Sequence, residues 1–250
     1  MIDPHFPFLT FGKKKIEKDL DGEERHLDLI LCLGCRVSYG SDRWTKFVNR
    51  SIGFDQWKDA RRADVAIAAR IMSAIANQMS NTGSTFLVLP MIGSKKTHAS
   101  DDDPVTKLAT AFRPSHSSDL WHHTTTLLRK KPHTPLHKIK AGKKARLDTI
   151  RNTHSLSCDR KSLKTLGADQ IYLVDDIVTL GSTMNDAARA IRETGGYDGH
   201  IIGVALAKHI LSDEPVEESP FFDWIRRPPQ SKWINQYDPG IERDLLEFCR

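Results

Sequence analysis

The sequence predicts an α/β fold in which helices flank a central, mainly parallel sheet. The first observation is a buried strand, Ile171 to Val174, that continues through a short loop into a helix, Met184 to Arg192. The second is another apolar strand, Ile201 to Ala207, which follows the turn at Gly195-Gly196. A strand, a helix and a strand in this order pair in parallel, because the helix returns the chain to the same end of the sheet. The third is an upstream apolar run, Thr85 to Pro90, which is typical of a buried strand.

Three further elements are expected outside this unit. Leu27 to Leu33 is a short apolar run with strand character, and the Ala- and Ile-rich stretch from Ala60 to Gln78 is typical of a helix. Asn81-Thr82-Gly83 would end that helix. Ile241 to Phe248 indicates a short helix.

The length of 250 residues suits one large domain, or one domain with an appendage. We expect a variable N-terminal segment over 1–60, a core over 61–210 and a C-terminal appendage over 211–250. Within the core, residues 97–164 are expected to form a basic, flexible segment.

Composition favours a cytoplasmic protein with no membrane partner. The hydrophobic fraction is 39% and the charged fraction 28%, which is typical of soluble globular chains. No apolar run approaches the roughly 20 residues that span a bilayer, and the N-terminus lacks the apolar core of a signal peptide. The four cysteines do not form the pattern of a disulfide framework, which favours a reducing compartment.

The most informative stretch runs from Ile171 to Thr183. Its apolar strand leads into two adjacent carboxylates, Asp175 and Asp176, which can accept hydrogen bonds from vicinal hydroxyls or hold a hydrated divalent cation. A loop of small and hydroxyl-bearing residues then precedes a helix N-terminus, which favours a phosphate group. The loop consists of Thr179, Leu180, Gly181, Ser182 and Thr183.

This stretch resembles the phosphoribosyl-pyrophosphate (PRPP) signature of type I phosphoribosyltransferases. The resemblance implies that Asp175 and Asp176 hold the ribose hydroxyls with Mg²⁺, and that residues 179–183 bind the 5′-phosphate. Leu180 departs from the pattern, since Thr, Ser or Gly is commoner there. The alternative is an ordinary parallel strand that ends in acidic residues, as in receiver-type domains.

A second candidate loop follows the strand that ends at Pro90. It presents Ser94, Lys95 and Lys96, and in type I phosphoribosyltransferases a loop of this kind binds pyrophosphate. Cations and backbone amides stabilise a leaving group that carries several negative charges. The alternative is a surface turn with two solvated lysines.

A third stretch resembles the competence protein F-like branch of the family. Leu127-Leu128-Arg129 precedes Arg146 and the pair Arg151-Asn152, although His137 and Lys138 stand where a Gln is commoner. Relatives in that branch often carry an N-terminal zinc module. Here only Cys32 and Cys35 match it, and a structural zinc site needs four ligands, so no zinc is expected.

Basic residues are concentrated in one block. Residues 129–164 hold twelve Lys/Arg against two Asp, a net charge of +10 in a chain whose total is +5. The block is either a mobile loop that closes over PRPP, a nucleic-acid contact or a solvated loop. The candidate contacts are Arg129, Lys130, Lys131, Lys138, Lys140, Lys143, Lys144, Arg146 and Arg151.

The C-terminal appendage is rich in aromatic residues: Phe221, Phe222, Trp224, Trp233 and Tyr237. In this family a variable hood over the active site selects the acceptor base, and aromatics there can stack on it. Packing of the appendage onto the core is the favoured interpretation. Residues 1–60 are the other candidate for the hood.

The resemblance implies an enzyme of nucleotide metabolism that transfers phosphoribosyl from PRPP, with Mg²⁺, to a base or related acceptor and releases pyrophosphate. Its transition state should be oxocarbenium-like and stabilised by positioning and charge. The alternative is a PRPP- or nucleotide-sensing protein without turnover that acts with nucleic acid in DNA uptake, processing or defence. A homo-oligomer or a larger complex is compatible with both.

Overall fold

The computed structural model describes residues 9–11, 13–36, 85–113, 121–140, 142–158 and 167–209. The helices expected at Ala60–Gln78 and Ile241–Phe248 lie outside the described residues, as do the C-terminal aromatic residues and Cys249. Cys32 is buried and, like Cys158, forms no disulfide within the described part of the chain.

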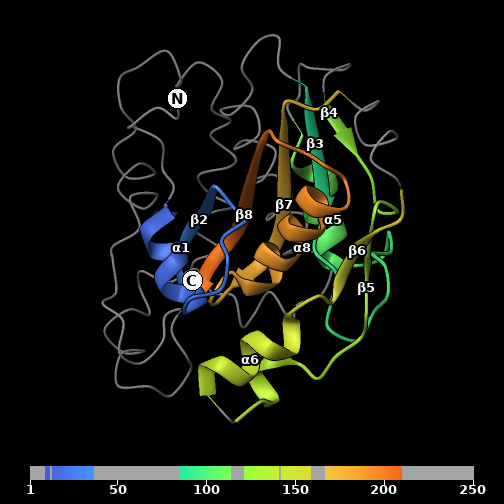
Figure 1. The fold of residues 1–250 in the computed structure, drawn as a ribbon. Coiled ribbons are helices and arrows are strands. Elements are labelled where there is room, and N and C mark those ends of the chain that lie inside the picture. Colours follow the sequence, from blue (N-terminus) through green and yellow to red (C-terminus); the bar gives the residue numbers. More distant parts are fainter. Residues whose placement is uncertain are drawn as a thin grey trace, which may run out of the picture.

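A six-stranded sheet forms the centre of the described structure (Figure 1), in the order β1-β2-β8-β7-β3-β4. Only β1 pairs antiparallel, with β2, and the other pairs in this sheet are parallel. The strands are β1 Leu9–Phe11, β2 Leu29–Arg36, β3 Phe86–Pro90, β4 Trp121–His123, β7 Gln170–Val178 and β8 His200–His209. The α/β class and the mainly parallel sheet are therefore confirmed.

A separate two-stranded antiparallel ribbon consists of β5 Leu128–Lys130 and β6 His154–Leu156. The chain between these strands forms a short 3₁₀ helix, η1 Leu136–Lys138, and the helix α6 Gly142–Ile150. Much of the stretch expected to be a flexible segment thus has regular secondary structure.

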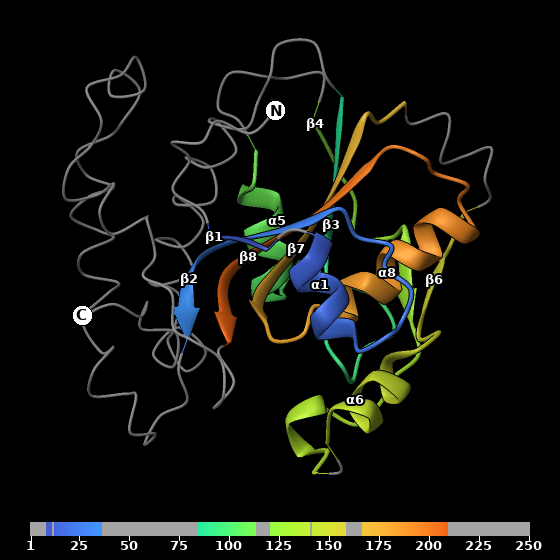
Figure 2. The same cartoon turned by 60° about the vertical axis from the view of Figure 1, so that its left-hand side comes forward.

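Helices cover both faces of the sheet (Figures 1 and 2). One face packs against α8 Ser182–Glu193, and α1 Lys13–Leu20 lies beside it. The opposite face packs against α5 Pro104–Ala111, where the ring of Phe112 meets that of Tyr172 edge to face at 5.2 Å.

The sheet is apolar on both faces because parallel strands between helix layers are shielded from water on each side. On β7, Ile171, Tyr172, Leu173 and Val174 are all at most 1% exposed. The helix α8 contributes a stripe of small and apolar residues to this core, and the stripe includes Met184, Ala187, Ala188 and Ile191.

The strand–helix–strand prediction is confirmed as β7-α8-β8, with β7 and β8 in parallel register from Gln170↔His200 to Val178↔Lys208. The strands expected at Thr85–Pro90 and Leu27–Leu33 appear as β3 and β2. No helix in the described ranges has the length and apolar character needed to cross a membrane.

Candidate functional site

The two carboxylates of the signature lie within β7, at the point where one of its neighbours ends. Pro90, the last residue of β3, pairs with Val174, and the Met91 N–H donates to the Val174 carbonyl over 2.8 Å. On its other side β7 continues to pair with β8, and Asp175 lies opposite Ala205. The carboxylates therefore stand at the carboxyl edge of β3, the usual ligand edge of an open α/β sheet.

These two carboxyl groups influence each other. Burial raises the pKa of Asp175 well above its usual range, and the charge of Asp176 and a side-chain hydrogen bond with it raise that pKa further, whereas the hydrogen bond from the Asp176 N–H lowers it. One oxygen of Asp175 accepts the Asp176 N–H at 2.8 Å, and one oxygen of Asp176 accepts the Ile177 N–H at 2.7 Å. Such a pair of neighbouring carboxylates attracts cations or hydroxyl donors.

The loop Thr179–Thr183 turns the chain directly from β7 into α8. Gly181 is the N-cap residue of α8, and among the described residues no side chain caps this helix end. The Asn185 N–H closes the first helical turn on the Gly181 carbonyl at 2.8 Å. The first backbone N–H groups of a helix have no intrahelical acceptor, so this end suits an anion.

Glycine is favoured at 181 by its backbone conformation and by the limited space around it. Its φ of +76° lies in the left-handed region, and a Cβ there would approach Ile30 Cδ1 to 2.7 Å. Gly203 of β8 permits a second close approach, since a Cβ there would lie 2.6 Å from Met184 Sδ. These contacts hold the start of α8 tightly against β2 and β8.

A buried lysine lies beneath the same loop. Lys208, near the end of β8, is 2% exposed and donates from Nζ to the carbonyl oxygen of Thr179. It also pairs with Asp19 of α1 over 3.2 Å. Because Lys208 engages the Thr179 carbonyl, α1 and β8 together fix the start of the loop. Nothing in the local sequence pattern singled out Lys208 or Asp19.

The second candidate loop, residues 91–97, leaves β3 beside Asp175. Met91 and Ile92 are buried, whereas Gly93, Lys95 and Lys96 are exposed. The Lys96 N–H donates to the Gly93 carbonyl at 3.0 Å, and the Lys96 ammonium pairs with Asp103 at the start of α5. Of the two predicted cations, Lys96 thus has a carboxylate partner close to its own loop.

The chain after β5 runs alongside this loop. The Lys130 N–H donates to the Thr97 carbonyl at 2.9 Å, and the His133 N–H donates to the Ser94 carbonyl at 2.8 Å. The Lys130 side chain is buried, and its Nζ donates to the Ile92 carbonyl at 2.7 Å. The structure therefore brings Lys130 to the carboxylate end of the site, whereas sequence reasoning grouped it with the basic block as a candidate contact of an active-site loop or of nucleic acid.

Asp186 of α8 anchors the turn that contains Arg151 and Asn152. It accepts hydrogen bonds from the Asn152 and His154 N–H groups, each at 2.8 Å, and from His154 Nδ1 at 2.9 Å. Arg189 adds an ion pair at 2.9 Å. Burial alone would raise the pKa of Asp186, but the hydrogen bonds from His154 and the ion pair with Arg189 hold it far below its usual range.

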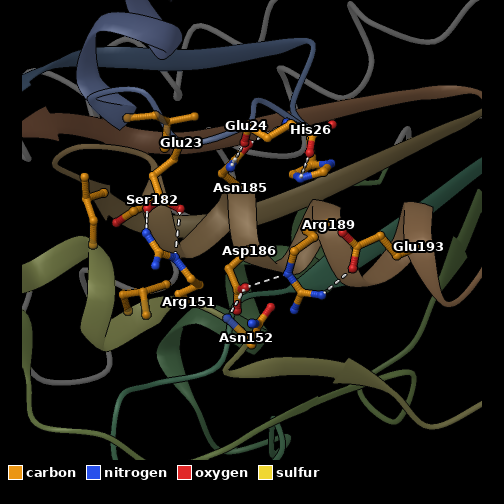
Figure 3. A pocket seen from close by; sticks show the side chains of 13 residues that line it. Glu23, Glu24, His26, Arg151, Asn152, Ser182, Asn185, Asp186, Arg189 and Glu193 are labelled. Carbon is orange, nitrogen blue, oxygen red and sulfur yellow. Dashed lines mark hydrogen bonds and ion pairs between the residues drawn. The ribbon is translucent and has the colours of Figure 1, made fainter. Parts of the chain in front are cut away.

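A polar cleft of about 160 Å³ runs along α8 between the segment before β2 and the turn after α6 (Figure 3). Ser182 of the signature loop lines it, and Arg151 and Glu23 form an ion pair across it. Arg189 pairs with Glu193 at 2.8 Å as well as with Asp186. The charges that line the cleft are largely paired with one another, and among the lining residues sequence reasoning had singled out Arg151, Asn152 and Ser182.

Five cations of the basic block lie on or next to η1 and α6. Lys138, Lys140 and Lys144 are exposed. Lys143 of α6 donates to the Lys18 carbonyl of α1 at 2.7 Å, and Arg146 donates to the Ile139 carbonyl at 3.2 Å. This part of the block forms a basic surface on η1 and α6, beside the lysine-rich α1.

The two carboxylates suit Mg²⁺, which takes further ligands from substrate and water, better than they suit a metal ion held by protein side chains alone. Mg²⁺ prefers oxygen ligands and is commonly held by one or two carboxylates together with substrate phosphates and water. Asp175 and Asp176 offer such oxygens. Within the described ranges no group of three or more His, Cys, Asp or Glu residues could hold a metal ion.

No protein-family model and no curated protein matches this chain. The functional argument therefore depends on the geometry of the site.

Proposed function

We propose that this protein is a type I phosphoribosyltransferase-like enzyme, which binds PRPP with Mg²⁺ and transfers the phosphoribosyl group to a base or related acceptor. One observation carries the proposal. Two adjacent carboxylates at the carboxyl edge of β3 precede a glycine-capped helix N-terminus, and a second loop with exposed cations emerges beside them. Ribose hydroxyls, a 5′-phosphate and pyrophosphate are the groups that these three features suit.

Each feature has a distinct part in the proposed reaction. Asp175 and Asp176 bind the ribose 2′- and 3′-hydroxyls and hold Mg²⁺, which supplies charge neutralisation for pyrophosphate when bound. The backbone N–H groups and hydroxyls of residues 179–183 hold the 5′-phosphate. Loop 91–97 faces the leaving pyrophosphate. Catalysis then depends on orientation and on charge stabilisation of an oxocarbenium-like transition state, without a protein nucleophile.

Calorimetric titration of PRPP with and without Mg²⁺ tests this proposal. The wild-type protein should bind PRPP in a metal-dependent manner. The double variant Asp175→Asn, Asp176→Asn should lose at least about tenfold in affinity, about 1.4 kcal/mol, while its circular dichroism spectrum stays unchanged. Asp101→Asn, Asp102→Asn is a matched control, because these adjacent carboxylates are exposed in the turn before α5. Equal affinity in the two double variants would exclude the proposed role of the β7 pair.

A second candidate function is a nucleotide-sensing protein that acts with nucleic acid. The exposed lysines of η1 and α6, which continue onto α1 through the Lys143–Lys18 contact, favour it. Clustered cations bind phosphate backbones with a steep dependence on salt. Replacing Lys138, Lys140, Lys143 and Lys144 by Gln should reduce the salt slope of DNA or RNA binding, measured by fluorescence anisotropy. An unchanged salt slope would show that this surface does not contact the nucleic acid.

A further inference from the structure

Lys130 is an unusual residue for a two-stranded ribbon. Its side chain is 5% exposed, whereas Arg129 before it and Lys131 after it are exposed. Burying a charged ammonium group is costly unless a partner compensates it. Here Nζ donates to the neutral carbonyl of Ile92, and no ion pair within 4 Å joins Lys130 to any carboxylate among the described residues. The cost of burial is therefore not offset by a direct ionic partner in that part of the chain.

The electrostatic surroundings of Lys130 indicate where its charge acts. Burial lowers the pKa of Lys130 to about 8, and the charges of Asp175 and Asp186 raise it in part. Reciprocally, the Lys130 charge lowers the pKa of Asp175 against the stronger effect of burial. Lys130 is thus close enough to Asp175 for their charges to interact, although the two form no direct ion pair.

Backbone contacts fix the same residue to the candidate pyrophosphate loop. The Lys130 N–H and Nζ donate to the carbonyls of Thr97 and Ile92, so one residue holds both ends of loop 91–97. The His133 N–H holds Ser94 in the middle. Meanwhile Lys96, a predicted pyrophosphate cation, pairs with Asp103.

From these observations we infer that Lys130 is the positioning residue of the pyrophosphate half of the site: it fixes loop 91–97 through two carbonyls and supplies a buried positive charge between that loop and Asp175. This inference deepens the proposed function and depends on it. The ligand group concerned is a magnesium-complexed diphosphate, whose negative charge offsets the remaining cost of burying the Lys130 ammonium group. The 5′-phosphate loop at the start of α8 should not depend on Lys130.

The test compares Mg²⁺-pyrophosphate, ribose 5-phosphate and PRPP as separate calorimetric probes. Lys130→Met should weaken the binding of Mg²⁺-pyrophosphate and of PRPP at least about tenfold, and should change the affinity for ribose 5-phosphate by less than about twofold. If Lys130 had a merely structural role, the substitution would weaken the binding of all three probes together. Lys107→Met is the matched control, since Lys107 is exposed on α5, and it should leave all three affinities unchanged.

The outcomes separate this inference from the proposed function. If the wild-type protein binds none of the probes, the proposed function fails and the inference with it. If the wild type binds PRPP and Lys130→Met binds all three probes equally well, or loses all three equally, only the inference is overturned. If Lys130→Met does not fold, Lys130→Gln decides, because it keeps a hydrogen-bond donor and removes the charge. This variant should weaken the binding of Mg²⁺-pyrophosphate and PRPP but not of ribose 5-phosphate, and an equal effect on all three would overturn the inference.

Discussion

Asn185 and Asp186 are neighbours on α8, yet they hold segments from different parts of the chain. The Asn185 amide oxygen accepts the His26 N–H at 2.7 Å, and its amide nitrogen donates to the Glu24 carbonyl at 2.8 Å. Asp186 instead holds the turn before β6. Single polar side chains near the start of α8 thus fix the loops on both of its sides.

The close packing at the start of α8 is most easily tested at Gly181. Alanine at a left-handed position costs about 1–2 kcal/mol, and at 181 its Cβ would also displace Ile30. Gly181→Ala should therefore weaken Mg²⁺-PRPP binding at least about tenfold by calorimetry. Gly167→Ala is the control, because Gly167 has a φ of +60° but no atom within 4 Å of the place that a Cβ would take. Equal PRPP affinity in both variants would show that the loop tolerates the displacement.

Among the secondary-structure elements, β8 and α1 meet beneath the loop Thr179–Thr183. Lys208 of β8 bridges the Thr179 carbonyl and Asp19 of α1, and Asp19 also pairs with Lys15 at 3.0 Å. The contact links an N-terminal helix to a strand near the far end of the described chain. Since a buried carboxylate without its partner is costly, removal of Lys208 should affect both elements.

Lys208→Met should lower the free energy of unfolding by about 3 kcal/mol, because it removes the buried partner of a carboxylate that is itself buried. Lys15→Met, which removes the more exposed partner of Asp19, should cost less than about 1 kcal/mol. Urea denaturation measures both values. The double variant Asp19→Leu, Lys208→Met should recover part of the loss. A cost for Lys208→Met no larger than that for Lys15→Met would contradict the bridging role.

Across the molecule, local patterns predicted the centre of the sheet well. Continuous apolar runs identified β3, β7 and β8, and the loop chemistry after Asp176 identified the start of α8. The pairing of β2 with β8 and the place of Lys130 depend on contacts between residues far apart in sequence, which no local pattern records. The short elements β1, β4, β5 and β6 have only three residues each, too few to show a period.

Buried histidine makes the stability of the fold depend on pH. The His154 side chain is fully buried, and burial lowers its pKa, which the charges of Lys130 and His133 lower further while Asp186 raises it. A histidine whose pKa is lower in the folded state than in the unfolded state stabilises the fold at pH values above its unfolded pKa of about 6.5. This stabilisation is lost as the pH falls. The lowered pKa of Asp186 also stabilises the fold at neutral pH, and this contribution is lost at still lower pH.

The free energy of unfolding should therefore decrease between about pH 7 and pH 5, as measured by urea denaturation at intervals across that range. His154→Gln should flatten this dependence, whatever its effect on stability at neutral pH. His200→Gln is the control, because His200 is exposed at the start of β8 and should leave the slope unchanged. A slope in His154→Gln equal to that of the wild type would assign the dependence to other groups.

The sheet order also constrains how the chain is made. The strand β2 is synthesised before its parallel neighbour β8, which follows about 170 residues later. Until β8 emerges from the ribosome, the apolar run Leu29–Leu33 has an unpaired edge, which is a template for aggregation. The yield of folded protein should therefore depend on aggregation through this run before β8 is made, as well as on the stability of the finished sheet.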